Sequence, residues 1–217
     1  MPFDHSIDDL AGLRRLYADP HRIIADKAID HIDEKSQTFI ARSPFVVVAT
    51  SGERGTDASP RGGPPGFVTV LDDRRLALGD LAGNRRLDSF ENLLANPSVG
   101  LLFLIPGMGE TLRVNGRATL TTDPAVLEAC AFLGTQPKLA LGVDVDEVFL
   151  HCAKALRRSQ LWSPATWPSA DGRPRAAAIW RDQLALDTSL DEMEAELEVS
   201  YAETMWQAGG EDEPARS

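Results

Sequence analysis

Two adjacent arginines follow a turn near the middle of the chain. Asn84 marks the turn, and Arg85 and Arg86 begin an amphipathic segment, residues 84–96, that ends before a proline. If this segment is a helix, two cations in its first turn oppose the helix dipole, and a bound anion would offset that cost. Free backbone N–H groups beside two guanidinium groups suit a terminal phosphate. We therefore expect a phosphate site here; the alternative is a solvated basic pair bridged to acidic residues of the same segment.

A second unusual segment, "DASPRGGPPG" at residues 57–66, separates two apolar runs. A plain hairpin needs only a few turn residues, and glycine and proline supply them. This segment has ten residues and adds a hydroxyl, Ser59, and a single cation, Arg61. Its length and these two polar side chains therefore need a further explanation.

Polar side chains alternate with apolar ones along residues 110–121. On a strand, Leu112 and Val114 would face one side and Arg113, Asn115 and Arg117 the other. Such a row of polar groups lines either a ligand site or the solvent-facing wall of a barrel.

Residues 151–162 combine cations, a hydroxyl and a large aromatic ring. These groups belong to Lys154, Arg157, Arg158, Ser159 and Trp162. A ligand that carries both a phosphate and a flat ring would use all of them. The alternative is the basic end of a strand beside a core tryptophan.

No metal centre or catalytic triad is indicated, and we assign no catalytic side chain from the sequence. Four histidines lack metal-ligand spacing, and we expect them to be structural or solvated: His5, His21, His31 and His151. Cys130 and Cys152 form no CxxC pair, and we expect buried, reduced thiols. Asp144 and Asp146 are expected in a solvated loop, which gives little support to a paired-carboxylate hydrolase.

The elements that must position these residues are mostly short strands. Apolar runs rich in β-branched residues predict about six of them, at residues 44–51, 66–73, 74–80, 99–107, 110–121 and 147–158. Helical segments at residues 84–96 and 123–134 interrupt the strands. Because strands and helices do not alternate regularly, a small antiparallel barrel of mainly β, α+β class is favoured over a doubly wound sheet.

Helical segments are expected on both sides of the barrel. Apolar residues at helical spacing at residues 6–17 and 20–33 predict an N-terminal helical arm over residues 1–38. The barrel then occupies residues 39–164.

The C-terminal part is expected to be a loop and an acidic amphipathic helix, residues 165–206. Ser189 and Glu192 form a capping box at the start of that helix. Residues 207–217 have too few apolar side chains to form a core and are expected to be disordered.

The net charge of −11 is concentrated at the C-terminal end. Residues 182–217 hold eleven acidic residues and one basic residue, so the rest of the chain is nearly neutral. An acidic end repels phosphates, which argues against a nucleic-acid partner. The chain has no long apolar window, and its N-terminus is acidic and amphipathic. We therefore expect no membrane partner and a cytoplasmic location.

Four successive segments resemble a single protein family. Residues 49–73, 76–107, 110–121 and 149–162 are similar to the FMN-dependent flavoproteins of the pyridoxamine 5′-phosphate oxidase-like superfamily, and most similar to a bacterial branch of unassigned substrate. The resemblance covers residues 39–164. It implies an FMN-binding split β-barrel that forms a homodimer, with one FMN per subunit held at the subunit interface and shared by both chains.

Residue by residue, the resemblance assigns cofactor contacts and gives the long segment at residues 57–66 a role. Ser59, Pro60, Arg61 and Gly62 would pass beside the flavin, where small glycines allow close approach.

The phosphate-binding turn of the family places Ser or Asn before two basic residues, which here are Asn84, Arg85 and Arg86. Asn92 could also face the ligand. The remaining candidates would contact the ring or act from the second subunit: Arg113, Lys154, Arg157, Ser159 and Trp162.

The C-terminal region departs from the family. Enzymes that oxidise vitamin B6 phosphates carry an Arg-Leu-His-Asp-Arg pattern there that grips the substrate. Residues 172–194 of this chain lack the histidine and continue into acidic residues. The departure argues against vitamin B6 phosphate as the substrate.

The function implied is that of an FMN-dependent oxidoreductase acting on a small organic molecule, with a nicotinamide cofactor as the candidate electron donor. A flavin carries the electron chemistry and the protein supplies orientation and charge, so the lack of a triad is compatible with this function. The alternative is a non-catalytic module of the same barrel that binds a flavin, a deazaflavin or haem for sensing, storage or delivery.

Overall fold

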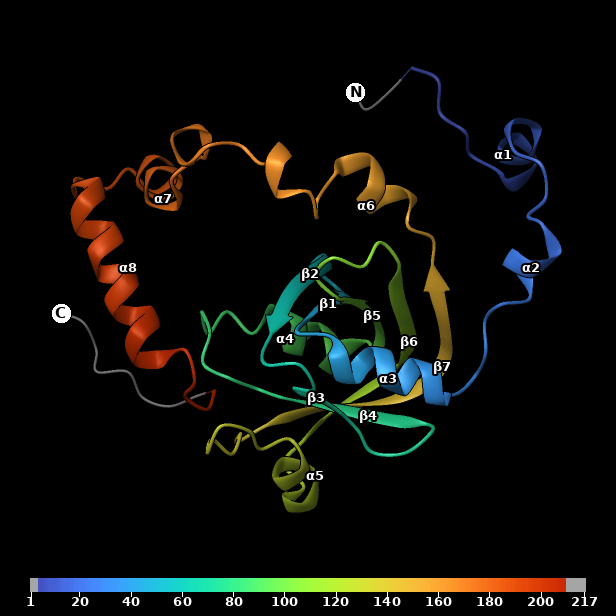
Figure 1. Ribbon diagram of the computed structural model, residues 1–217, viewed down its shortest axis with the longest axis horizontal. Coiled ribbons are helices and arrows are strands. Elements are labelled where there is room, and N and C mark those ends of the chain that lie inside the picture. The colour runs from blue at the N-terminus through green and yellow to red at the C-terminus, as the bar shows by residue number, and fades with distance from the viewer. Residues whose placement is uncertain (1–3, 210–217) are drawn as a thin grey trace.

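The computed structural model describes residues 4–209, which form one seven-stranded antiparallel sheet that curls on itself, with helices around it (Figure 1). The strands are β1 (Phe45–Gly52), β2 (Gly55–Gly62), β3 (Val68–Val70), β4 (Arg75–Gly79), β5 (Ser98–Leu104), β6 (Thr111–Thr121) and β7 (Ala140–His151). Across the sheet their order is β2-β1-β5-β6-β7-β4-β3. The predicted α+β split barrel of antiparallel strands is confirmed.

Eight α-helices occur among residues 4–209. They are α1 (Leu10–Leu16), α2 (Arg22–Ala25), α3 (Glu34–Arg42), α4 (Asp88–Ala95), α5 (Pro124–Ala129), α6 (Lys154–Ser159), α7 (Ala176–Leu184) and α8 (Leu190–Thr204), with 3₁₀ turns at Pro164–Thr166 and Ala170–Gly172. Figure 1 shows α3 against the barrel, α1 and α2 extending on one side, and α7 and α8 on the other.

Alternate residues of the central strands form the core. Val48 in β1, Leu101 and Phe103 in β5 and Val114 in β6 are at most 1% exposed, and Ile40 of α3 is fully buried with them. This follows the two-residue period of a strand, and each such side chain contributes about 1.5–3 kcal/mol by its burial. The packing fixes the register of β1, β5 and β6 and leaves their other face outside the core.

The strand β2 is one that the sequence did not predict. It contains Pro60, whose missing N–H would break a ladder in the middle of a sheet. β2 lies at the sheet edge and pairs only with β1, with Pro60 opposite Val47. Most of the segment expected as a long turn is therefore the edge strand.

The helix α4 begins later than predicted. It starts at Asp88, because Arg85 and Leu87 adopt positive φ angles of 56° and 58° that a helix cannot continue. Arg85 and Arg86 thus precede the helix, and acidic residues, Asp88 and Glu91, occupy its first turn. The conflict expected between the two arginines and the helix dipole does not arise.

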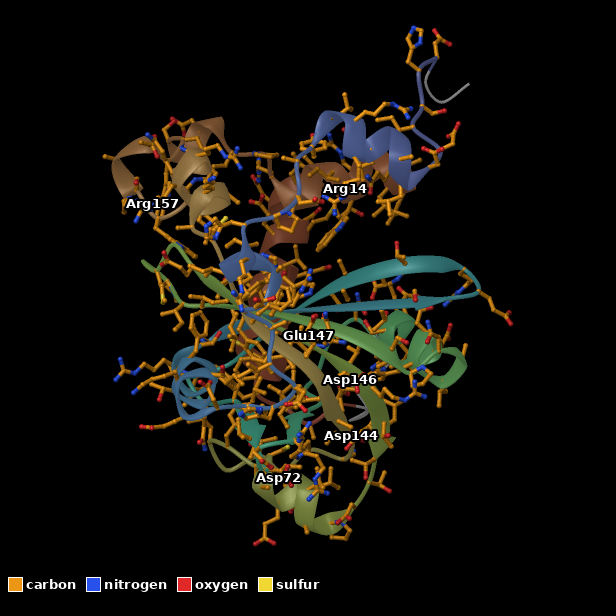
Figure 2. The ribbon with its side chains drawn as sticks, turned by 90° about the vertical axis from the view of Figure 1, so that its right-hand side faces the viewer. Arg14, Asp72, Asp144, Asp146, Glu147 and Arg157 are labelled. Carbon is orange, nitrogen blue, oxygen red and sulfur yellow. The ribbon has the colours of Figure 1, made fainter. Side chains whose placement is uncertain are left out.

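The strand predicted at residues 147–158 exists as β7, but both of its predicted bounds were wrong. It stops at His151, and Lys154–Ser159 forms α6, whose Lys, Ala, Leu and Arg residues are good helix formers. At the other end, β7 begins at Ala140, so Asp144 and Asp146 lie in a strand and not in a loop (Figure 2).

A bulge interrupts the pairing of β6 with β7. Asn115 pairs with Glu147 but Gly116 pairs with Val145, which leaves Asp146 without a partner across the ladder. A bulge of this kind bends the strand and redirects side chains.

The N-terminal arm differs from the prediction in its helices. α1 and α2 are short, and α3, which the sequence did not predict, crosses the expected boundary at residue 39. Ile29 pairs with Val148 of β7, so the segment between α2 and α3 is attached to the barrel. Most of the apolar side chains expected to pack from the first two helices are exposed, and five of them are 43–71% exposed: Leu10, Leu13, Leu16, Ile23 and Ile24. Ile32, expected on the second helix, is buried in the core.

At the C-terminal end, α8 opens with the predicted capping box of Ser189 and Glu192. Beyond it, residues 207–209 run beside β4's end: Gly209 N–H donates to the Asp80 carbonyl, and Ala208 is buried. Disorder was predicted from residue 207; these three residues are ordered, and residues 210–217 lie outside the described part.

The two cysteines differ from one another. Cys130 is buried, as predicted, and its burial raises the pKa of its thiol. Cys152 was expected to be buried but is exposed, because it follows the last residue of β7.

Candidate functional site

The start of α4 is attached to the edge strand β2. The Ser89 hydroxyl donates a 2.7 Å hydrogen bond to the Asp57 carboxylate, and the Arg61 guanidinium lies 5.9 Å from the centre of the Phe90 ring. Asp57, Ser59 and Arg61 alternate along β2 and are half-buried, so they share the face that meets α4. The intervening Pro60 and Gly62 are exposed.

The predicted phosphate turn, Asn84 to Arg86, lies next to this strand. The Asn84 side-chain oxygen accepts a 3.1 Å hydrogen bond from Arg86 N–H, which closes the turn. The Arg86 guanidinium donates to Asp88 at 2.7 Å, and the Asp88 carboxylate raises the pKa of Arg86, with a smaller contribution from Asp57 of β2. Because Arg86 bonds Asp88 of α4, and the next residue, Ser89, bonds Asp57 of β2, the turn lies close to β2.

Arg86 therefore makes the acidic contact that was the alternative to phosphate binding. Its side chain is nonetheless well exposed, and an exposed ion pair is screened by solvent and weakly held. An incoming anion could replace Asp88 at Arg86 at small cost.

A half-buried carboxyl, Asp80, interacts electrostatically with Arg61. Asp80, which follows β4, loses solvent contact, and this burial raises the pKa of its carboxyl; the Arg61 cation acts in the opposite direction. Arg61 therefore lies near the Phe90 ring and close enough to the Asp80 carboxyl to affect its pKa.

Asn92 of α4 faces the barrel. It is 8% exposed and donates a 3.1 Å hydrogen bond from its Nδ2 to the hydroxyl of Thr50 in β1, which is 4% exposed. The side chain that was predicted to face the ligand therefore links α4 to β1.

The other predicted residues form a second group, near the start of β6 and the end of β7. Arg113 is half-buried in β6, and the Trp162 indole N–H donates to the Met108 carbonyl at 2.8 Å, just before β6. Ser159 bonds only within its own helix, to the Leu156 carbonyl, and Lys154 and Arg157 are exposed on α6. Figure 2 places Arg157 at the end of the molecule away from Asp72.

One chain does not bring the two groups together. β2 and β6 are separated by β1 and β5, and strands lie about 4.8 Å apart, so the Cα atoms of the two groups are roughly 14 Å apart across the sheet. A ligand that contacts both groups needs a second chain or must span the sheet.

A groove that the sequence did not indicate crosses the outer face of β2, β1, β5 and β6. It has a volume of about 630 Å³. Small residues are among those that line it: Ala49, Ala58, Gly100 and Gly116. They come from four strands, so only the strand pairing reveals that they are neighbours. Asn115 and the bulged Asp146 also line the groove.

Neither a metal centre nor a membrane span is found in residues 4–209. No group of three His, Cys, Asp or Glu side chains there could hold a metal ion. No helix in the same range is long and apolar enough to cross a bilayer.

The sequence profile of one family, described as pyridoxamine 5′-phosphate oxidase, matches residues 32–152, more than half of the chain. The chain belongs to this family. Membership supports a flavin-binding function. The matched range contains the β2 and α4 groups and Arg113, whereas Lys154, Arg157, Ser159 and Trp162 lie beyond it.

Solved structures with a similar fold include HupZ of Group A Streptococcus, at 18% identity, covering 55% of this chain and 93% of that one with a TM-score of 0.45. General Stress Protein 26 of Bacillus anthracis is 16% identical, covering 54% and 91% with a TM-score of 0.42. An FMN-binding protein of Syntrophomonas wolfei is 11% identical, covering 54% and 84% with a TM-score of 0.42. No curated protein sequence matches the chain.

Proposed function

We propose that this protein binds FMN and is an oxidoreductase acting on a small organic molecule, with NADH or NADPH as the electron donor. Family membership supports the flavin. The observation that carries the assignment of the site is the attachment of α4, which directly follows the Asn84–Arg86 turn, to β2 through the Ser89–Asp57 hydrogen bond.

The groups at this turn fit the phosphate of FMN. Arg85 and Arg86 are exposed guanidinium donors, Asn84 adds an amide, and Arg61 lies on the adjacent strand. The N-cap of α4, Leu87, has no side chain that could bond the first N–H groups of the helix. Cations beside uncapped N–H groups are the donor set that binds a phosphate.

The edge strand suits the rest of the cofactor. Pro60 and Gly62 are exposed and add little bulk, so a flat ring could approach the β2 backbone. When bound, FMN would supply hydride and electron transfer. The side chains of Ser59 and Arg61 would orient it, and the Asp80 carboxyl beside Arg61 would limit the net positive charge there.

We propose further that the protein is a homodimer with FMN at the interface. The separation of the two predicted groups supports this, because the Arg113, Lys154, Arg157, Ser159 and Trp162 group of a second copy could meet the β2 and α4 group of the first. Exposed apolar side chains also need cover, and they lie on both extensions of the barrel: Leu10, Leu13, Leu16, Trp180 and Leu184.

Vitamin B6 phosphate is not the substrate we propose. Residues 172–194, where the substrate-gripping histidine would lie, contain no histidine and form α7 and the start of α8. Arg175 in this region is bonded to Glu194 and Asp191, so its guanidinium is already neutralised within the C-terminal segment.

The phosphate assignment is tested by the FMN affinity of Arg85→Ala/Arg86→Ala, measured by quenching of flavin fluorescence. We expect the FMN affinity to fall by about tenfold or more, since each substitution removes charge-assisted hydrogen bonds to the phosphate. The control is Arg74→Ala/Arg75→Ala, another adjacent exposed pair, which bonds Asp30 and Asp72 away from this turn. Equal affinity in the two double variants would contradict the assignment.

The redox activity is tested by adding NADH or NADPH without oxygen to the protein loaded with FMN. Bleaching of the flavin absorbance, followed by its return on adding an electron acceptor, supports an oxidoreductase. A flavin that neither donor reduces would favour the non-catalytic flavin-binding module.

A further inference from the structure

Two cations converge on one aromatic ring at the far end of β7. The Arg113 guanidinium of β6 lies 4.5 Å from the centre of the Phe149 ring, and the Lys27 ammonium lies 4.9 Å from the same centre. The His151 ring is 4.9 Å from Phe149. Strand pairing explains this arrangement. Arg113 of β6 lies opposite Phe149 of β7. On the other side of β7, Ile29 pairs with Val148, which brings nearby Lys27 to the same ring.

The Arg113 side chain has an unsatisfied polar atom. Its Nε is buried and has no hydrogen-bond partner in the described part of the chain. Buried donors without a partner are rare, and each needs an explanation such as a bound ion or ligand. The Lys27 ammonium donates a hydrogen bond to the Leu150 carbonyl at 2.7 Å and has the capacity for two more.

Glu147, the acidic residue of β7 nearest to Phe149 in sequence, already accepts a hydrogen bond. Glu147, two residues before Phe149 and on the same face, accepts a 2.7 Å hydrogen bond from Asn115. No ion pair joins Glu147, or any other acid of residues 4–209, to Arg113 or Lys27 within 4.0 Å. Within residues 4–209, positive charge therefore accumulates around the ring without an ion-pair partner.

The electrostatic effect on His151 agrees with this geometry. Burial lowers the pKa of His151 below its ordinary value, and the Arg113 and Lys27 cations lower it further. A field that disfavours a third cation favours an anion at the same place.

We propose that Arg113 and Lys27, converging on Phe149, bind the carboxylate or phosphate group of a small anionic molecule, with His151 as a further donor. The planar fork of Arg113 matches either oxyanion. The site is distinct from the Asn84–Arg86 turn of the same chain, from which β1 and β5 separate it. Its arginine, Arg113, also belongs to the group that we propose meets FMN from a second copy of the chain.

The experiment follows the His151 ring by proton NMR in the full-length protein as purified, with the resonance assigned by His151→Gln. Inorganic phosphate is titrated in one series and acetate in another, at constant ionic strength and a pH near 6. We expect a saturable change at His151 with at least one of the two anions, and the responsive series identifies the oxyanion.

The sign of the pKa change is part of the prediction. A bound anion stabilises protonated His151 and offsets Arg113 and Lys27, so the pKa of His151 rises on binding. By linkage the anion binds more tightly at pH values below that pKa. Glu147 is the acidic group on the same face, and its bond to Asn115 is unaffected by the anion in this account.

Matched variants separate the site from a general charge effect. Arg113 and Lys27 approach from opposite sides of β7. Arg113→Met and Lys27→Met are each expected to lower the affinity for the anion by about tenfold or more. Arg117→Met removes an exposed arginine on the same face of β6 and is expected to leave the affinity unchanged. Dispersed amide spectra of all variants show that they are folded.

Three results would overturn the proposal. One is a change without saturation that all four histidines share. Another is a saturable change at His151 whose anion affinity is the same in Arg113→Met and Lys27→Met as in Arg117→Met. The third is a change that follows protein concentration and not anion concentration, which would assign the cluster to a contact between two copies of the chain.

Discussion

Ser89 and Asp57 join the first turn of α4 to the edge strand β2 by a 2.7 Å hydrogen bond. Ser89 is 4% exposed, so the bond is shielded from water on one side. It connects the segment that follows the basic turn with the strand that carries Ser59 and Arg61. Both parts of the proposed cofactor site are therefore held in one arrangement before any ligand binds.

Ser89→Ala tests this connection. It leaves the Asp57 carboxylate without its donor, and we expect a loss of about 1 kcal/mol in the free energy of unfolding, measured with denaturant. FMN affinity should fall as well, because the turn can move relative to β2. Ser98→Ala, an exposed serine on β5, serves as the control. Unchanged stability and affinity would show that the bond does not position the turn.

Asn92 and Thr50 allow a second test, because the sequence and the structure give Asn92 different roles. The hydrogen bond between them is buried, so Asn92→Ala and Thr50→Val should each reduce the free energy of unfolding by about 1–3 kcal/mol. The double variant should lose less than the sum, since both changes remove the same bond. If Asn92→Ala instead weakened FMN binding at full stability, Asn92 would be a ligand contact.

Asp80 gives a pH-dependent prediction. Its folded-state pKa is raised by burial, so ionisation of Asp80 costs free energy only in the folded protein. This cost is absent below the unfolded-state pKa, about 3.9, and grows as the pH rises through the folded-state pKa. Asp80→Asn should therefore raise the melting temperature at pH 7 and have a smaller effect toward pH 4. A destabilisation of equal size at every pH would mean that the carboxylate is satisfied in the folded state.

Gly116 is expected to tolerate no side chain at the bulge. A Cβ there would lie 2.2 Å from the Asp144 carbonyl oxygen, which belongs to the rigid backbone of β7. Gly116→Ala should destabilise the protein by about 2 kcal/mol or more in a denaturant titration. Gly142→Ala, on the partner strand, meets its nearest atom at 3.7 Å and is the control. Similar losses in both variants would contradict the close approach at the bulge.

The strands that could be predicted are runs of apolar, β-branched or aromatic residues. Such residues form most of β1 and β5 and alternate with polar ones in part of β6, because one face of each strand is buried. β2 lacks it, since its residues are mostly small or polar and it is held by its pairing with β1. α6 was predicted as strand because it directly continues the apolar run of β7, although Lys154 to Arg158 favour a helix.

The candidate site shows the same limit. The basic turn was visible in the sequence because three suitable residues are adjacent: Asn84, Arg85 and Arg86. The approach of Arg61 to the Phe90 ring depends on how β2 meets α4 and could not be predicted from spacing. The cluster around Phe149 was missed because Lys27 reaches it from the arm, far away in sequence.

The central claim, that the chain holds FMN, is tested most directly by an absorbance spectrum of the purified protein, with a mass measurement of the ligand released by acid. We predict flavin bands and the mass of FMN at about one per chain. A protein that contains no flavin and takes up none when FMN is added would contradict the claim, and bands of haem or the mass of a deazaflavin would assign the site to that ligand instead.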